Sequence, residues 1–241
     1  MTKRTKLILG AAAVAVVLVG VAGWWFLIRD DAPAAVSLED ARESVEDAAP
    51  ADPDAGADGL DGPWSVDATV GSFDDFSGNF AGYRVDEELS TIGSTTAVGR
   101  TPGVDGTLTL EGSSVTEAEV TVDLTGLESD EGFRDSAAQR ALDTGQFPEA
   151  VFVTTEPIDV GSEPADGAAV TTDVAGELTL HGETLPVVAA SEAELAGGTM
   201  IVTGTIDIDM TDYGITPPQA GPVLSISDQG QIEFQLFFTQ G

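Results

Sequence analysis

The chain has 241 residues, of which 42 are acidic and 9 are basic, and its formal net charge at pH 7 is −33. A surface this negative repels nucleic acids and anionic headgroups, so neither class of partner is expected to bind directly. The chain contains no cysteine, which excludes disulfides, thiolate catalysis, cysteine-ligated metals and a cysteine-linked lipid anchor. Ten of its fifteen aromatic residues are Phe and it has 28 glycines, a mixture that suits strands joined by tight turns.

The N-terminal segment has the pattern of a membrane anchor. Residues 7–28 carry no charge and, as a helix, would cross a bilayer core of roughly 30 Å. The preceding residues 1–6 form a basic tip, which places the N-terminus in the cytoplasm and everything after Arg29 outside. A cleaved signal peptide is the alternative, since residues 32–34 (APA) loosely resemble a cleavage site. We therefore expect a single-pass protein of the cell membrane with an extracytoplasmic C-terminal domain.

Residues 29–62 are predicted to form an acidic, flexible tether. They are rich in Ala, Asp, Glu and Pro, and the stretch 48–56 has no large apolar residue. Such a stretch cannot bury enough surface to offset the entropy lost on ordering. Residues 37–48 could form a short acidic helix with Ser37 as its N-cap. The tether would keep the next domain near the membrane without pinning it there.

Residues 63–241 alternate apolar and polar side chains with the period of a β-strand. One apolar and one polar face are typical of antiparallel strands with a solvated outer side. Turn signals such as His181-Gly182 separate the strands, and residues 129–145 indicate a short helix between two of them. The clearest alternating runs are 107–110, 119–124, 177–180, 205–210 and 232–238.

About eight such strands can close into a barrel, and closure removes exposed sheet edges. The predicted fold class is therefore an all-β, antiparallel, eight-stranded (or similar) barrel with one short helical insertion, preceded by a single transmembrane helix. Side chains fill a barrel of this size, or it holds one small ligand. The alternation does not choose between these two states, and it leaves a two-sheet sandwich open.

Five short motifs occur in a fixed order along this domain. They are residues 64–67 (WSVD), 121–124 (TVDL) with 133–135 (FRD), 144–152 (TGQFPEAVF), 176–184 (GELTLHGET) and 212–215 (DYGI). Together they resemble the YceI-like family of lipid- and polyisoprenoid-binding proteins. Two features depart from that family. The His-Ser pair often found near its first strand is missing, and residues 80–85 (FAGYRV) look like a variant branch instead. Members of the family are often secreted freely, whereas this chain has the pattern of an anchored protein.

The resemblance implies a lipocalin-like barrel over residues 63–241 whose lumen holds the tail of a polyprenol or an isoprenoid quinone. The implied work is storage, transfer or a stress response. Burying such a tail gains about 25 cal/mol per Å² and needs no catalytic group. The alternative is that the same side chains fill a core. The candidate contacts are Leu108, Leu110, Val120, Val122, Leu124, Ile206, Ile208, Phe234 and Leu236 by alternation, Phe152 by resemblance, and Phe133 and Phe147, with Tyr83 and Tyr213, beside loops at the mouth.

Arg134 is the candidate for a ligand headgroup. Bases are rare after residue 62, and an arginine suits phosphate or carbonyl oxygens. The alternative is an ion pair with a nearby acid such as Asp135 or Asp123. The sequence leaves both interpretations open.

The sequence does not predict an enzyme. The single histidine, His181, lies in a predicted hairpin tip, and no nucleophile elbow, P-loop or zinc motif occurs. Asp207 and Asp209 share the outer face of one strand, where they could hold a cation but could not flank a scissile bond. We expect no cofactor, no metal and no nucleic acid; the expected partners are an isoprenoid lipid or quinone and the membrane. The alternative function is a surface-displayed structural or protein-interaction β-domain without a ligand.

Overall fold

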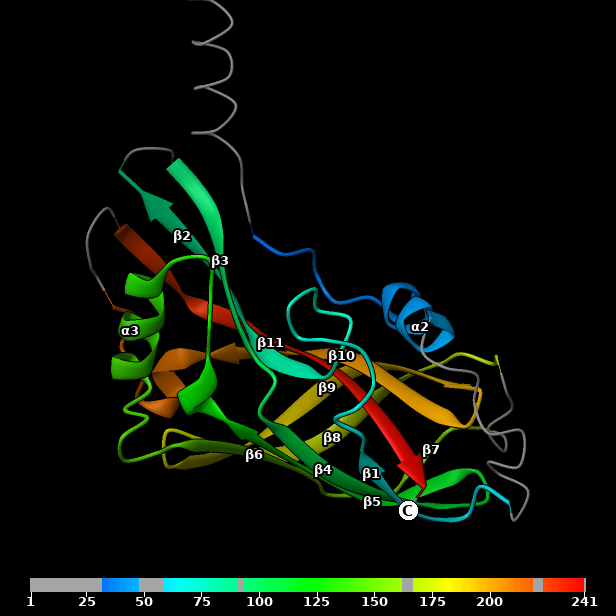
Figure 1. The fold of residues 1–241 in the computed structure, drawn as a ribbon. Helices are drawn as coiled ribbons and strands as arrows, with labels where there is room; N and C mark the ends of the chain where they lie inside the picture. The colour runs from blue at the N-terminus through cyan, green and yellow to red at the C-terminus, as the bar shows by residue number, and fades with distance from the viewer. Residues whose placement is uncertain (1–31, 48–58, 91–92, 162–166, 219–222, 241) are drawn as a thin grey trace, which may run out of the picture.

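The computed structural model describes residues 32–47, 59–90, 93–161, 167–218 and 223–240, and its centre is an antiparallel sheet rolled into a barrel (Figure 1). Two short helices, α2 (Leu38–Asp47) and α3 (Gly132–Ala141), accompany the sheet. Two 3-10 turns, η1 (Leu124–Gly126) and η2 (Met210–Tyr213), follow strands directly. The strands are β1 (Gly62–Val66), β2 (Phe80–Leu89), β3 (Gly93–Thr101), β4 (Val104–Glu111), β5 (Ser114–Asp123), β6 (Glu149–Thr154), β7 (Ile158–Asp159), β8 (Val170–Leu180), β9 (Glu183–Ala196), β10 (Thr199–Asp209) and β11 (Val223–Gln240).

Eight strands close the barrel in the order β1-β4-β5-β6-β8-β9-β10-β11, and pairing of β11 with β1 completes the ring. The long strand β11 pairs with β1 at residues 238–240 and with β2 at residues 223–235. The β2–β3 hairpin therefore continues the wall beyond β1 along the same edge of β11. The predicted closed, eight-stranded antiparallel barrel is confirmed, and the two-sheet sandwich is excluded.

The apolar side chains gather inside the barrel in three clusters, because successive residues of a strand point to opposite faces. Registers such as Trp64 opposite Leu108, and Leu108 opposite Ala118, put apolar residues on one face of neighbouring strands. The first cluster contains Trp64, Leu108, Leu110, Val115, Leu195, Met200, Leu236 and Phe238. The second contains Leu124, Leu127, Ala150, Leu178, Leu180, Tyr213 and Ile215, and the third contains Val174, Ala189 and Ile206.

Each of the two helices lies in a segment for which the sequence indicated a short helix. The predicted insertion at 129–145 contains α3. The possible helix at 37–48 is α2, and the Oγ of Ser37 accepts a hydrogen bond of 3.2 Å from the N–H of Asp40, as a helix N-cap does. The fold thus has two short helices instead of the single insertion that the predicted fold class contained.

Residues 32–47, which we call the strap, lie against the outer wall of the barrel (Figure 1). Ala41 of α2 is fully buried against Ile201 of β10 and Phe237 of β11, and both of these are also fully buried. This differs from the free, flexible tether predicted for residues 29–62. The physical reason is that Ile201 and Phe237 point outward from the barrel, so α2 removes their apolar surface from water.

The predicted membrane anchor at 7–28 and the basic tip at 1–6 lie outside the described residues. Within the described ranges, no helix is both long and apolar enough to cross a bilayer. The two α-helices there have ten residues each.

Candidate functional site

The barrel encloses a cavity of about 320 Å³. Its wall is formed by the inward side chains of the strands and by α3, and most of these side chains are apolar. Small-molecule sites in proteins occupy about 300–1,000 Å³ and are lined mainly by apolar groups with a few polar ones. The cavity therefore has the size and the chemistry of a site for one apolar ligand.

The structure brings the candidate contact residues together in the wall of this cavity, except for Phe147 and Tyr213. The alternation of each strand placed most of them correctly on the inward face, because that period does not depend on which strands become neighbours. Their contact with a ligand stays a prediction. The cavity is lined by Leu108, Leu110, Val120, Val122, Leu124, Phe133, Phe152, Ile206, Ile208, Phe234 and Leu236, and also by Arg134 and Tyr83.

Tyr213 is buried in the cluster around Leu180 and does not line the cavity. Phe147 packs on the β8–β9 turn instead of lining the cavity. Its ring meets the His181 ring edge-on, with centroids 5.0 Å apart. A Cβ atom on Gly182 would lie 2.6 Å from the same ring, so only glycine leaves room for it there. The Nδ1 atom of His181 is 2.8 Å from the carbonyl oxygen of Tyr213. These contacts hold the turn against η2, and Phe147 serves that packing.

Phe152 reaches the cavity although its own run, Val151-Phe152-Val153, does not alternate. It lies on β6 opposite Leu178 of β8 and Val120 of β5, and all three face inward. A Cβ atom on Gly176 would lie 2.4 Å from the Phe152 ring, so this glycine makes space for the ring. The family resemblance, and not the local pattern, identified this residue.

The rim of the cavity holds one buried charge cluster. Arg134 of α3 places its Nη2 atom 2.7 Å from Oε1 of Glu87 on β2, and its Nη1 atom contacts Asp130. The side chain of Glu87 is only 2% exposed, so its charge needs a partner. The Nε atom of Arg134 is buried and has no hydrogen-bond partner.

The sequence anticipated an ion pair of Arg134 as one possibility, but with other acids. Asp135 instead accepts hydrogen bonds from Ser129, and Asp123 caps η1 by accepting from Thr125. Glu87 could not be identified from the sequence, because one acid among 42 gives no signal and the contact spans 47 positions.

Electrostatics at the rim follow from burial and from this pair. Burial acts to lower the pKa of Arg134, but the hydrogen bond and the charge of Glu87 outweigh it and raise the pKa. Burial raises the pKa of Tyr83, which also lines the cavity, to about 12. A Cβ atom on Gly99 would lie 2.5 Å from the Tyr83 ring, so the glycine of β3 accommodates it. Both groups therefore keep their protons at neutral pH.

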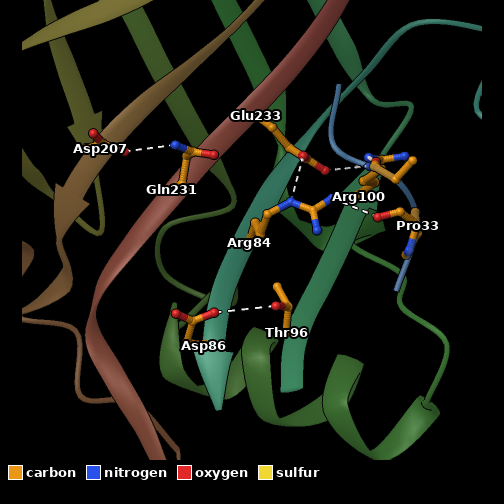
Figure 2. Close-up of polar contacts among 9 residues, drawn as sticks. Pro33, Arg84, Asp86, Thr96, Arg100, Asp207, Gln231 and Glu233 are labelled. Carbon is orange, nitrogen blue, oxygen red and sulfur yellow. Dashed lines mark hydrogen bonds and ion pairs between the residues drawn. The ribbon is translucent and has the colours of Figure 1, made fainter. Parts of the chain in front are cut away.

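A second buried charge cluster lies on the outer face of β2 (Figure 2). Glu233 of β11 is fully buried and accepts from Nε of Arg100 at 2.7 Å and from Nε of Arg84 at 3.2 Å. The Nη2 atoms of the same arginines donate to the strap, Arg84 to the carbonyl of Pro33 at 2.8 Å and Arg100 to that of Ala34 at 2.6 Å. This outer cluster binds the strap to the barrel.

Comparisons with known sequences agree with this architecture. The family model described as "YceI-like domain" matches residues 83–238. A UPF0312 protein of Pseudomonas fluorescens is 32% identical over 140 residues, which cover 54% of this chain and 70% of that protein. A UPF0312 protein of Vibrio parahaemolyticus is 26% identical over 159 residues, which cover 62% of this chain and 77% of that protein.

Solved structures share the fold at low sequence identity. A polyisoprenoid binding domain from Saccharophagus degradans, implicated in plant cell wall breakdown, superposes with a TM-score of 0.58 at 19% identity and covers 74% of this chain and 98% of that domain. A mutant YceI protein of Campylobacter jejuni superposes with a TM-score of 0.50 at 12% identity, over 59% and 84% of the two chains. Because the family model spans more than half of the sequence and the barrel is shared, the chain belongs to the YceI-like family.

Proposed function

We propose that this protein binds an isoprenoid-type lipid, such as a polyprenol or an isoprenoid quinone, and holds the tail in the barrel cavity. The observation that carries the proposal is the cavity of about 320 Å³, lined by apolar side chains inside a closed barrel. The alternative, a surface-displayed β-domain without a ligand, would fill this volume with side chains. The solved Saccharophagus degradans relative, named a polyisoprenoid binding domain, supports the ligand class.

The physical chemistry of the tail suits a binding protein better than an enzyme. Each buried methylene is worth about 0.8 kcal/mol, so one five-carbon isoprene unit contributes roughly 4 kcal/mol. Burial by a wall of Leu, Val, Ile and Phe therefore supplies affinity without any reactive group. The protein would store, transfer or protect the lipid, and we propose no catalysis.

We also propose that residues 7–28 anchor the chain in the cell membrane and that the barrel lies outside the cytoplasm. The charge-free run and the basic residues before it support this placement. The strap adds a constraint, because Pro33 contacts the barrel and follows Ile28 by only five residues. Five extended residues reach at most about 18 Å, so an anchored barrel would lie close to the bilayer surface.

The test is to purify the full chain, extract it with organic solvent and analyse the extract by mass spectrometry. A stoichiometric isoprenoid would support the proposal and identify the cargo. If no lipid is found and the stripped protein takes up neither an added polyprenol nor an added quinone, the ligand-free interaction domain replaces it.

A pair of variants tests the wall itself. Val122→Asp places a charge in the cavity, and we expect it to abolish lipid uptake because a buried unpaired carboxylate is strongly unfavourable. Thr121→Asp places the same charge on the neighbouring residue of β5, which points to the other face, and should leave uptake unchanged. Circular dichroism confirms folding of both. Retained uptake by a folded Val122→Asp protein would contradict the assignment of the wall.

A further inference from the structure

Four charged residues contribute to the cavity wall, and they differ in where their side chains point. The side chains of Arg84 and Glu194 point to the outer face, where Arg84 pairs with Glu233 and Glu194 pairs with Arg42 of the strap. Glu87 and Arg134 pair with each other, at a distance of 2.7 Å. Within the described part of the chain they are therefore the charges that a ligand in the cavity would meet.

The charge of Arg134 is already compensated. Its guanidinium contacts two carboxylates, those of Glu87 and Asp130, so the three side chains together carry a net charge of −1. A phosphate brought to this rim would approach two negative groups that already occupy the terminal nitrogens of the arginine. Placing a negative headgroup beside these carboxylates should lower the affinity for the lipid by about tenfold or more. The rim therefore disfavours an anionic headgroup.

A neutral oxygen does not meet this repulsion. A carbonyl or hydroxyl oxygen adds no charge beside the carboxylates of Glu87 and Asp130. Nε of Arg134 is buried without a hydrogen-bond partner and has almost no accessible surface, so the selection rests on charge and not on this donor. Tyr83 lines the same cavity and interacts electrostatically with Arg134, so a neutral oxygen placed there would also lie near a protonated phenol.

We propose that the Glu87–Arg134 cluster selects isoprenoids with an uncharged oxygen headgroup, a polyprenol hydroxyl or a quinone carbonyl, over polyprenyl phosphates. This inference rests on the proposed lipid binding and adds to it the residues that set the choice of headgroup. Glu87 acts as a specificity-determining residue because its carboxylate neutralises the arginine that a phosphate would need. Arg134 holds the Glu87 carboxylate in place at the rim.

The test compares geranylgeraniol with geranylgeranyl monophosphate, which share one tail and differ only in the headgroup. Both compete at equal concentration for the purified full chain in detergent, and native mass spectrometry gives the ratio of the two complexes. We expect the alcohol to be favoured by about tenfold or more, as like-charge repulsion implies. Equal occupancy, or an excess of the phosphate, overturns the proposed selectivity.

Two single-charge variants locate the effect. Glu87→Gln removes a carboxylate from the rim, and we expect the ratio to shift towards the phosphate by about tenfold. Asp86→Asn removes the same charge from the next residue of β2, which is exposed on the outer face beside Thr96 (Figure 2), and the ratio should not change. The two lipids partition into the detergent equally in every sample, so this effect cancels when the ratios of the variants are compared with that of the wild type. An unchanged ratio in folded Glu87→Gln overturns the role of Glu87, while binding of neither ligand to the wild type overturns the lipid-binding function as well.

Discussion

The two faces of β2 carry two buried ionic clusters that differ in how completely their hydrogen bonds are satisfied. On the outer face, Glu233 bonds to Arg84 and Arg100, and each arginine also donates to a carbonyl of the strap. On the inner face, Arg134 bonds to two carboxylates, but its Nε has no partner. The chain itself completes the hydrogen bonds of the outer cluster, whereas the inner cluster keeps one buried donor without a partner.

This difference separates a structural role from a binding role. Buried polar groups in proteins nearly always find partners, so a closed network needs nothing further and an open one calls for an explanation. The outer cluster is closed and is further covered by the rings of Phe76 and Phe80, which lie 4.5 and 4.2 Å from the Arg100 guanidinium carbon. The inner cluster keeps one buried, unpaired donor, and its residues Glu87 and Arg134 line the cavity.

The largest expected effect comes from opening the outer cluster. Glu233→Gln leaves Arg84 and Arg100 without their shared carboxylate, and removing one partner of a buried pair costs about 3–5 kcal/mol. Denaturant unfolding of the full chain measures this loss. The control Asp207→Asn removes a carboxylate that is exposed and bonded only to Gln231 in the described structure, and should change stability by less than about 0.5 kcal/mol. Equal losses of unfolding free energy in the two variants would show that the buried outer cluster contributes no more stability than an exposed polar contact.

A pH measurement sharpens the description of the inner cluster. The pKa of Tyr83 is raised to about 12, above the ordinary value of 10, because the phenol is buried. A group whose pKa is raised on folding contributes stability that is complete below pH 10 and is lost as the pH rises to 12. A two-unit shift corresponds to at most about 2.7 kcal/mol.

Tyrosinate absorbance can follow Tyr83 alone in a Tyr213→Phe background. Tyr213 is a suitable position to change because its hydroxyl is buried without a partner. We expect the remaining tyrosine to ionise about two units above a free tyrosine, and the stability of this variant to fall between pH 10 and 12. Ionisation near pH 10 in the folded protein would show that Tyr83 is solvated and that the rim is open to water.

The sequence predicted the inner face better than the outer one, and the reason is physical. A period of two residues assigns inward side chains such as Leu108 and Val122 without knowledge of strand neighbours. The outer docking of the strap needed tertiary information, but a signal was present. Met200-Ile201-Val202 and Leu236-Phe237-Phe238 are apolar at both parities, which indicates strands covered on both faces.

The charge clusters could not be predicted, because their members come together only through closure of the barrel. Arg84 and Glu233 are separated by 149 positions, and Arg134 and Glu87 by 47. The rarity of arginine after residue 62 marked Arg134 as important. It could not reveal whether the partner would be a headgroup or an acid, and the structure gives an acid with one donor left over.

The smallest expected effect comes from releasing the strap, which removes its two carbonyls from the outer cluster but leaves the ion pairs of Glu233 with Arg84 and Arg100 in place. Ala41→Glu puts a charge at the fully buried contact of α2 with Ile201 and Phe237, and detachment of this short segment should cost about 1–2 kcal/mol. Hydrogen exchange of residues 32–47 should rise strongly, whereas Glu43→Gln on the exposed face of α2 should leave it unchanged. Lipid uptake should persist in both proteins, because the strap is bound to the outer cluster and the cavity belongs to the inner one. Loss of uptake on release of the strap would show instead that the outer cluster transmits its state through β2 to the rim.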